Sequence, residues 1–252
     1  MILQTLSQYY ERLKDDPQAD IPLFGFGKQK IHFALVLSKE GKLIQIRDLR
    51  EKPKSKSIPA VLTLPQIGKK RVSDIAPNFM WDNTGYVLGR DAKGKEARAL
   101  KCFVAFRQLH HKLGDNIQDP GMKAVLGFLD SWKPEDAPAL ERWEKMAGTN
   151  LVFRLDGGRM YIHEHAEVRQ TWTKYCAEKG SKITATCLVS GEETPIARLH
   201  PIIKGVKGTQ TTGAGIVSFN LAASLSYNKK QNFNAPVGES AAFAYTTALN
   251  HL

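Results

Sequence analysis

Four residues of this sequence could hold a metal ion: His163, Glu164, His165 and His200. The two-residue spacing of His163 and His165 places both side chains on one face only in a strand, and the helical HExxH pattern is absent. Neither a nucleophile elbow nor an acid–base pair stands out. We therefore expect no metal, no other cofactor and no enzymatic activity. A metal-dependent nuclease that uses these four residues is kept as an alternative.

Positive charge gathers in two parts of the chain. Residues 194–238 carry five Lys or Arg and no Asp or Glu (+5), and residues 39–71 carry ten basic and three acidic side chains (+7). The formal net charge of the whole chain is +11, so these two basic segments account for all of the excess. Charge localised in this way is typical of a surface that binds a polyanion, and nucleic acid is the first candidate.

A basic triplet opens the polar stretch 68–84. Its charged residues are Lys69, Lys70 and Arg71, and its neutral hydrogen-bonding residues are Ser73, Asn78 and Asn83. The charged side chains are suited to phosphate, and the neutral ones are suited to base edges. Phe79 and Trp81 lie in the same stretch, and rings of this size are more often core than base-stacking platforms. A solvated face is the alternative interpretation of the triplet.

The carboxylate-free segment contains a second candidate loop, residues 204–215. Its glycines let a backbone approach closely, its amides and hydroxyls suit phosphate oxygens, and Lys204 and Lys207 add charge. A Walker A loop needs Gly-Lys followed by Ser or Thr, and the order here is different. Nucleotide hydrolysis therefore has little support, and a flexible surface loop is the alternative.

Hydrophobic spacing predicts the elements that position these loops. Apolar residues at three- and four-residue steps predict helices over 2–13, 95–113, 120–132, 168–180 and 239–252. Short apolar and β-branched runs predict a hairpin from 31–37 and 43–46, a strand at 61–64, a second hairpin across 150–162 and a strand at 216–220. We expect the first helix to dock on a sheet. The fold class is predicted as α+β, with a mixed or antiparallel sheet, packed helices and long basic loops.

Composition limits the class of protein. With 252 residues and 42% apolar content, the chain can bury a core as one large domain or two small ones. Its three cysteines form no CxxC pair, so we expect reduced thiols. The N-terminus does not read as a signal peptide, and no apolar run approaches membrane-spanning length. We expect a cytoplasmic protein with no membrane partner.

Several stretches of unusual composition carry a resemblance to a known family. They include Phe33–Leu37, Ile75–Thr84, Tyr86–Gly89, Asn150–Arg154, Pro195–Pro201, Ile216–Asn220 and Asn234–Val237. Together they resemble the large subunit of the type I-C CRISPR Cascade complex, with matches from Met1 to Leu252. Family members continue into a helical bundle, and the last predicted helix here lacks a Gly, Asn or Pro stop signal. The resemblance implies that residues 1–252 are the N-terminal DNA-recognition domain of a longer subunit, without that bundle.

The resemblance also implies a function and partners. A Cascade large subunit recognises the protospacer-adjacent motif (PAM) in duplex DNA and promotes R-loop formation, while base pairing with the guide reads the rest of the target. It does not cut DNA itself. The implied partners are double-stranded target DNA, crRNA, the other Cascade subunits, a recruited helicase-nuclease, and phage anti-CRISPR proteins.

Carried over by position, the resemblance assigns residues to these roles. PAM contact is assigned to Lys69, Lys70, Arg71, Ser73, Asn78 and Asn83. Phosphate contact is assigned to Lys52, Lys54, Lys56, Lys204 and Lys207. Gln210 is the candidate for opening the duplex. The remaining alternative is a module that only docks on crRNA or on another Cascade subunit.

Overall fold

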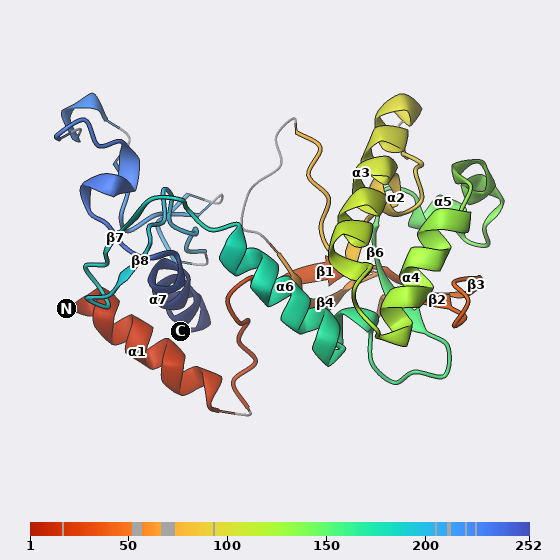
Figure 1. Ribbon diagram of the computed structural model, residues 1–252, viewed down its shortest axis with the longest axis horizontal. Coiled ribbons are helices and arrows are strands. Elements are labelled where there is room, and N and C mark those ends of the chain that lie inside the picture. The colour runs from red at the N-terminus through yellow and green to blue at the C-terminus, as the bar shows by residue number, and fades with distance from the viewer. Residues whose placement is uncertain are drawn as a thin grey trace. The chain divides into compact units, whose positions relative to one another are not determined.

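The chain folds into two compact units. The computed structural model describes residues 1–16, 18–51, 57–66, 74–92, 94–204, 206–210, 213–219, 221–224 and 226–252. Unit 1 consists of Met1–Phe24 and Ala177–Leu252, and unit 2 consists of Gly25–Cys176 (Figure 1). The recognition domain predicted over 1–252 therefore comprises two units. Among the described residues, no helix combines the length and apolarity needed to cross a bilayer.

A four-stranded mixed sheet organises unit 2. Its strand order is β3 (Leu43–Asp48), β2 (Phe33–Leu37), β6 (Asn150–Leu155) and β5 (Trp81–Asn83). β2 and β3 form the predicted antiparallel hairpin, whereas β2 and β6 run parallel. Every residue of β2 is buried, as expected for a central strand that is covered on both faces. The predicted α+β class with a mixed sheet is confirmed.

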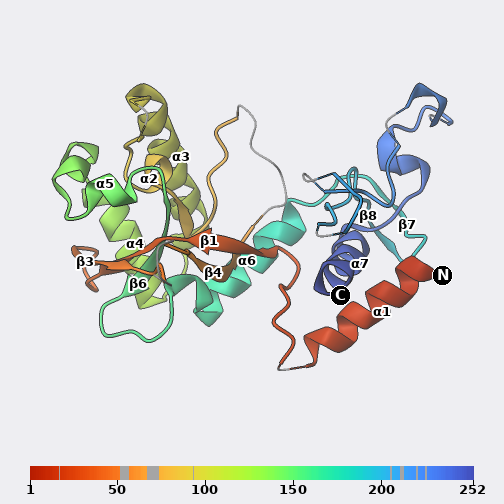
Figure 2. The same cartoon turned by 180° about the vertical axis from the view of Figure 1, so that it is seen from behind.

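Two helices cover one face of this sheet. Phe153 of β6 contacts Phe106 of α3 (Glu96–Gly114) and Phe128 of α4 (Pro120–Ser131), with ring centroids 6.3 and 6.0 Å apart. Figures 1 and 2 show both helices on the same side of the strands. Both helices were predicted, because their apolar residues follow the helical period.

A separate two-stranded ribbon covers the opposite face. It consists of β1 (Phe26–Ile31) and β4 (Ala60–Pro65), which pair antiparallel. Ile31 and Leu64 are fully buried in one cluster with Ala34 of β2 and Val152 of β6. The apolar run that was predicted as one strand from Ile31 therefore belongs to two strands, divided at His32, that lie in different sheets.

The other helices of unit 2 pack around this core. They are α2 (Thr84–Val87), η1 (Pro134–Ala139), α5 (Trp143–Met146), η2 (Ile162–Glu164) and α6 (Ala166–Glu178), the last of which continues into unit 1. Trp172 of α6 stacks on Phe79 at 5.5 Å between ring centroids, and its Nε1 donates to the carbonyl of Gly25 at 2.6 Å. The helix predicted over 168–180 is confirmed.

The second hairpin, predicted across 150–162, is wrong. β6 is its first strand, but the segment after the turn contributes only an isolated bridge between Arg154 and Tyr161. Both edges of β6 are instead occupied by β2 and β5, which come from earlier in the chain. A central strand of this kind has no free edge for a local hairpin partner.

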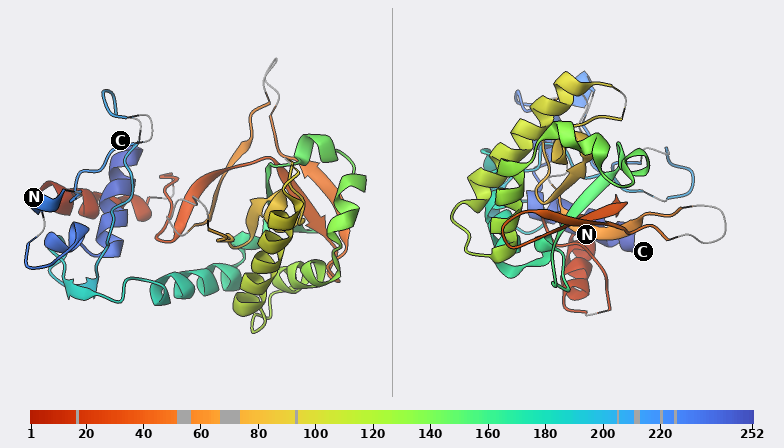
Figure 3. Two further views of the ribbon diagram at one scale, coloured as in Figure 1. Left: turned by 90° about the horizontal axis from the view of Figure 1, so that it is seen from above. Right: turned by 90° about the vertical axis from the view of Figure 1, so that its right-hand side faces the viewer.

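Unit 1 is built around two helices, α1 (Ile2–Lys14) and α7 (Glu239–His251), which were both predicted. Leu6 and Tyr10 of α1 share a buried cluster with Ala241 and Tyr245 of α7, and Figure 3 shows the two helices crossing. The expectation that the first helix docks on a sheet is therefore wrong. The alanines along α7 leave room for a second helix to approach closely.

The rest of unit 1 consists mostly of irregular segments. β7 (Thr184–Thr186) pairs with β8 (Glu193–Pro195), and two short helices follow, η3 (Ala222–Ser224) and η4 (Gln231–Asn234). The strand predicted at 216–220 is wrong for its described part, because residues 216–219 form no strand. Long connections in this region were predicted, since Gly, Ser, Thr and Asn are frequent there.

Candidate nucleic-acid interface

Two Lys-rich stretches flank one strand of unit 2, β4, in the sequence. The stretch before it contains Lys52, Lys54 and Lys56, and the stretch after it contains Lys69, Lys70, Arg71 and Ser73. All seven lie outside the described residues, so their assigned roles stay predictions. Six strand residues span about 20 Å. Each strand of a duplex has one phosphate about every 3.4 Å along the helix axis, so this length corresponds to the rise over about six phosphates.

The described residues on either side of the stretch 52–56 pair with each other. Glu51 and Ile58 form an isolated bridge, in which each backbone N–H donates to the carbonyl of the other residue at 2.9 Å. The bridge leads directly into β4. Glu51 is therefore held beside the start of β4.

The stretch 67–73 is anchored on its β4 side by three hydrogen bonds. The backbone N–H of Gln66 donates to the carbonyl of Gly25 at 2.8 Å, and its side-chain oxygen accepts from Gln29 Nε2 at 2.8 Å. The indole N–H of buried Trp81 donates to the carbonyl of Pro65 at 2.7 Å. The chain therefore leaves the ribbon at a fixed position.

The same stretch is anchored on its other side as well. The carboxylate of Asp82, which is 1% exposed, accepts from the backbone N–H of Asn78 at 2.9 Å. The backbone N–H of Met80 donates to Nε2 of His110 at 3.0 Å, and that of Ala76 donates to the hydroxyl of Tyr86 at 3.2 Å. Both ends of the stretch are thus fixed to the core of unit 2.

The neutral residues of the predicted PAM loop differ in availability. Asn83 caps α2, because its Oδ1 accepts from the backbone N–H of Gly85 at 2.9 Å, which leaves only its NH2 group for a base. Asn78 is half-buried and its backbone N–H donates to Asp82, while its side-chain amide makes no hydrogen bond to the described residues. Phe79 and Trp81 are 0% and 6% exposed, so the core interpretation of these two rings is confirmed.

The ribbon adds two lysines that the sequence analysis missed. Lys28 and Lys30 of β1 are exposed, and they lie opposite Thr63 and Val61 of β4. Their two-residue spacing places both on one face of the strand. That spacing could have been noticed, but both residues lie outside the basic segment 39–71. We call Lys28 and Lys30, together with the stretches 52–56 and 67–73, the basic ribbon.

A small pocket of about 110 Å³ lies where the ribbon meets η2 and α6. It is lined by Phe26, Thr63, His163, Glu164 and Arg169. The guanidinium of Arg169 lies 5.5 Å from the centre of the Phe26 ring, a cation–π contact. Burial, and after it the charge of Arg169, lowers the pKa of His163 to about 3, so this imidazole is neutral at physiological pH.

Two histidines of the alternative nuclease site have separate partners. His165 Nδ1 lies 2.7 Å from the Asp119 carboxylate, whereas Nδ1 of His163 is buried and has no hydrogen-bond partner among the described residues. His200 belongs to unit 1, where its Nδ1 is hydrogen-bonded to the hydroxyl of Tyr245 at 2.7 Å. Within the described ranges, no three His, Cys, Asp or Glu side chains are grouped so that they could hold a metal ion.

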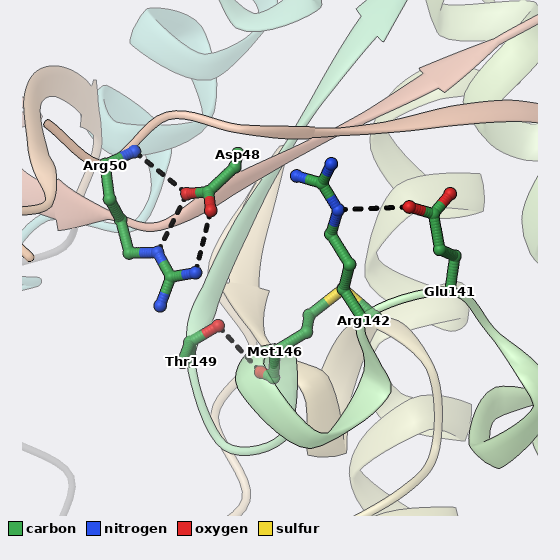
Figure 4. A network of polar contacts seen from close by, with 6 residues as sticks. All are labelled: Asp48, Arg50, Glu141, Arg142, Met146 and Thr149. Atoms are coloured by element: carbon green, nitrogen blue, oxygen red, sulfur yellow. Dashed lines mark hydrogen bonds and ion pairs between the residues drawn. The ribbon is translucent and has the colours of Figure 1, made fainter. Parts of the chain in front are cut away.

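One arginine of the first basic segment has a structural role. Asp48 accepts from Nε and Nη2 of Arg50, both at 2.8 Å, and the guanidinium lies 4.5 Å from the Phe33 ring centre. These hydrogen bonds lower the pKa of Asp48 to about 2. Figure 4 shows the pair close to Arg142, which is bonded to Glu141 at 3.2 Å. Arg50 therefore stabilises the edge of the sheet.

The second candidate loop is anchored within unit 1. Ile203 and Ala214 exchange two backbone hydrogen bonds of 2.9 Å, so the loop starts and ends at one bridge. The N–H of Lys204 donates to Oδ1 of Asn250 on α7 at 2.8 Å. Lys207 and Gln210 between these points are exposed. The two basic segments therefore lie in different units, and a DNA-binding face common to both stays a prediction.

The comparisons with known proteins identify a family. Curated proteins give no match to this chain. A family model described as CRISPR-associated protein (Cas_Csd1) matches residues 6–252, which is nearly the whole sequence. The resemblance to a Cascade large subunit is confirmed at the level of the family. The chain belongs to the CRISPR-associated protein (Cas_Csd1) family.

Proposed function

We propose that this Cascade subunit recognises the PAM in duplex DNA and promotes R-loop formation within a type I-C complex, without cutting DNA itself. The observation that carries the proposal is the basic ribbon. In the sequence, Lys-rich stretches flank β4 on both sides, and exposed Lys28 and Lys30 lie on the strand that pairs with it, β1. Cations at a regular interval, such as Lys28 and Lys30 on one face of β1, suit the regular phosphate spacing of a duplex.

The anchors of the stretch 67–73 support the assignment of motif recognition. Phosphate contacts position a protein on a duplex, and base contacts then provide specificity. Base contacts need side chains held in a fixed register, and such positions are most accurate when they are fixed by a rigid scaffold. The bonds from Gln66, Asn78 and Met80 to the core provide such a scaffold on both sides of the stretch.

The proposal includes partners and a compartment. In the cytoplasm, the subunit would contact crRNA and other Cascade subunits, recruit a helicase-nuclease for cleavage, and be a target of phage anti-CRISPR proteins. The separate partners of His165 and His200 support a non-cutting role. Incubation of the chain with plasmid and Mg²⁺ or Mn²⁺ should leave the plasmid intact. Cleavage that is lost in His165→Ala would instead support the nuclease alternative.

The motif preference of the assembled complex tests the main claim. Binding is measured by fluorescence anisotropy on duplexes with the PAM and with a scrambled motif. We expect Ser73→Ala or Asn78→Ala to reduce the affinity ratio of the two duplexes by about fivefold or more, because one base contact contributes about 1–3 kcal/mol of discrimination. Lys30→Ala should weaken binding to both duplexes equally.

Lys101→Ala is the matched control for the charge change. Lys101 is an exposed lysine on α3, which covers the opposite face of the sheet from the ribbon. We expect this variant to bind both duplexes like the wild type. If Ser73→Ala and Asn78→Ala both kept the full affinity ratio, the stretch would not read the motif, and a docking module would be the better account.

A further inference from the structure

Tyr227 in unit 1 is the one aromatic side chain of the described ranges that is fully open to solvent. It is 94% exposed, whereas the other aromatic rings in these ranges are buried or half-buried. It lies in the carboxylate-free segment 194–238, which precedes α7 and whose described parts are coloured from cyan to blue in Figure 1. A single exposed aromatic ring is common on protein surfaces and does not by itself indicate a function. Tyr227 differs in two respects: its backbone conformation is unusual, and the segment around it is basic.

The backbone at Tyr227 is an unusual place for a bulky residue. Tyr227 and Asn228 have φ of 49° and 57°, and the N–H of Lys229 donates to the carbonyl of Ser226 at 2.9 Å. A two-residue turn with positive φ at both central positions favours Gly, Asn or Asp. A tyrosine backbone is strained in this conformation, and its exposed ring gains no stabilisation from packing that could offset the strain. Strain of this kind is found mainly at functional sites.

A side-chain clamp holds this turn in place. Asn234 of η4 accepts from the N–H of Ser226 at 3.0 Å, and its Nδ2 donates to the carbonyls of Lys229 and Gln231 at 3.0 and 2.9 Å. Shortly after η4, the carbonyl of Pro236 accepts from the N–H of Leu188 at 2.9 Å, which attaches the turn to the core of unit 1. These hydrogen bonds therefore hold the turn that carries Tyr227 in a fixed position on unit 1.

The charged residues nearest to Tyr227 in the sequence are positive. Lys229 and Lys230 are exposed next to the turn, and Arg198 donates to the side chain of Gln231 at 2.8 Å. The segment 194–238 contributes no carboxylate. Proteins that bind single-stranded nucleic acid combine aromatic rings, on which bases stack, with cations that follow the phosphates. A duplex offers no free base face to such a ring, so a single strand is the occupant that fits.

We propose that Tyr227 is a stacking platform for an unpaired nucleobase, and that Lys229 and Lys230 bind the adjacent phosphates. This inference rests on the proposed function, because R-loop formation leaves one DNA strand unpaired. The recognised chemistry is the base face and the phosphate backbone, which displaced DNA and guide RNA share. The stacking site lies in unit 1, whereas the basic ribbon lies in unit 2.

The test measures single-strand binding by the 252-residue chain. Anisotropy is followed with a fluorescein-labelled 15-nucleotide strand, prepared both as DNA and as RNA. Tyr227→Asn removes the ring and keeps a residue that the turn favours, so its effect does not come from a disturbed backbone. We expect Kd to rise about 5- to 100-fold, as for the loss of one stacked base. Tyr227→Phe should remain within about twofold of the wild type, since stacking needs only the ring.

A control and an optical signal make the result specific. Ile183→Ala removes a 53% exposed apolar side chain from the same unit and should leave Kd unchanged. A strand with 2-aminopurine should show fluorescence quenching with the wild type and Tyr227→Phe, and not with Tyr227→Asn. Tighter binding of DNA points to the displaced strand, and tighter binding of RNA points to the guide. Either result is consistent with the stacking role.

The inference is overturned if Tyr227→Asn binds the strand as well as the wild type, or if the wild type binds no single strand. Its failure is distinguishable from a failure of the proposed function. If the complex still discriminates the PAM while Tyr227→Asn has no effect, only the stacking site is wrong. If PAM discrimination does not depend on Ser73 or Asn78 while Tyr227 still governs single-strand binding, only the proposed motif reading is wrong.

Discussion

His110 of α3 is fully buried, and both of its ring nitrogens have partners. Nε2 accepts from the backbone N–H of Met80 at 3.0 Å, and Nδ1 lies 2.7 Å from the carbonyl of Phe106. Because a carbonyl only accepts, Nδ1 carries the proton and the ring is neutral. Burial lowers the pKa of His110 to about 4. Protonation of Nε2 would remove the acceptor for Met80, next to the anchored end of the stretch 67–73.

This pKa predicts how stability depends on pH. The folded pKa is below the unfolded value of 6.5, so the contribution is fully present above pH 6.5 and is lost as pH falls towards 4. A shift of this size corresponds to roughly 3 kcal/mol. We expect the free energy of unfolding in urea to decrease over this window, and to decrease less in His110→Gln. Equal pH slopes for both proteins would contradict the assignment.

His111, the next residue, titrates with the opposite sign. It bridges Asp115 and Asp130 at 2.8 and 2.9 Å, and these hydrogen bonds raise the pKa of its imidazole. Its contribution is present below pH 6.5 and is lost as pH rises through the raised pKa. The bridge is largely exposed, so the effect is small. The loss of stability between pH 6.5 and 4 is therefore assigned to buried histidines such as His110.

Single residues were predictable where local chemistry decides their role. Phe79 and Trp81 were assigned to the core by size and are buried. Asn83 was assigned to base contact, but it caps α2 through Gly85, and an Asn immediately before a helix is a recognisable cap signal. Asp82 accepts a hydrogen bond from the backbone N–H of Asn78, and this bond depends on how the chain is folded. No sequence pattern of the kind that marks a helix cap predicts it.

Gly41 shows how one turn fixes an element against its neighbour. It has φ +83°, and a Cβ built on it would lie 2.5 Å from the backbone N of Phe128 and 2.7 Å from the carbonyl O of Ala124, both in α4. The turn between β2 and β3 therefore touches the helix backbone directly. Only glycine satisfies both the conformation and the close approach.

Gly41→Ala should destabilise unit 2 by more than backbone strain alone. Gly157→Ala is the matched control, because Gly157 has φ +70° and no atom within 4 Å of a built Cβ. We expect the control to lose about 1 kcal/mol and Gly41→Ala to lose roughly 2–4 kcal/mol in urea unfolding. Equal losses in the two variants would show that the turn does not pack on α4.

Elements were predictable where their pattern is local. The helices α1, α3, α4, α6 and α7 follow the 3.6-residue period, and the hairpin of β2 and β3 is joined by a short turn. Errors arose where a distant partner decides the structure. β6 pairs with β2 from more than a hundred residues earlier, so it could not form a local hairpin. α1 docks on α7, which lies at the other end of the sequence.

At the scale of the whole molecule, the chain separates its two basic segments. Residues 39–71 belong to unit 2 and residues 194–238 belong to unit 1. Sequence charge predicted both segments, because net charge needs no knowledge of the fold. It could not predict the division of the chain, since unit 1 joins the first 24 residues to the last 76. Each unit therefore has its own candidate nucleic-acid surface: the basic ribbon in unit 2, and in unit 1 the anchored loop with Lys204 together with the turn at Tyr227.

Weak duplex binding by the isolated chain follows from this charge layout. We expect Kd on the order of 10⁻⁴ to 10⁻⁶ M near physiological salt, which is typical of non-specific binding. Fluorescence anisotropy at several salt concentrations measures it. Affinity that did not change with salt would mean that the basic segments do not contact phosphates.

The central claim is that the basic ribbon binds the phosphates of duplex DNA, and the salt dependence of binding tests it most directly. The slope of log K against log salt is measured for the 252-residue chain, for Lys28→Ala with Lys30→Ala, and for the control Lys101→Ala. Each lost phosphate contact lowers the magnitude of the slope by about 0.9. We expect a decrease of about two for the double variant and none for the control. An unchanged slope in the double variant would contradict the account.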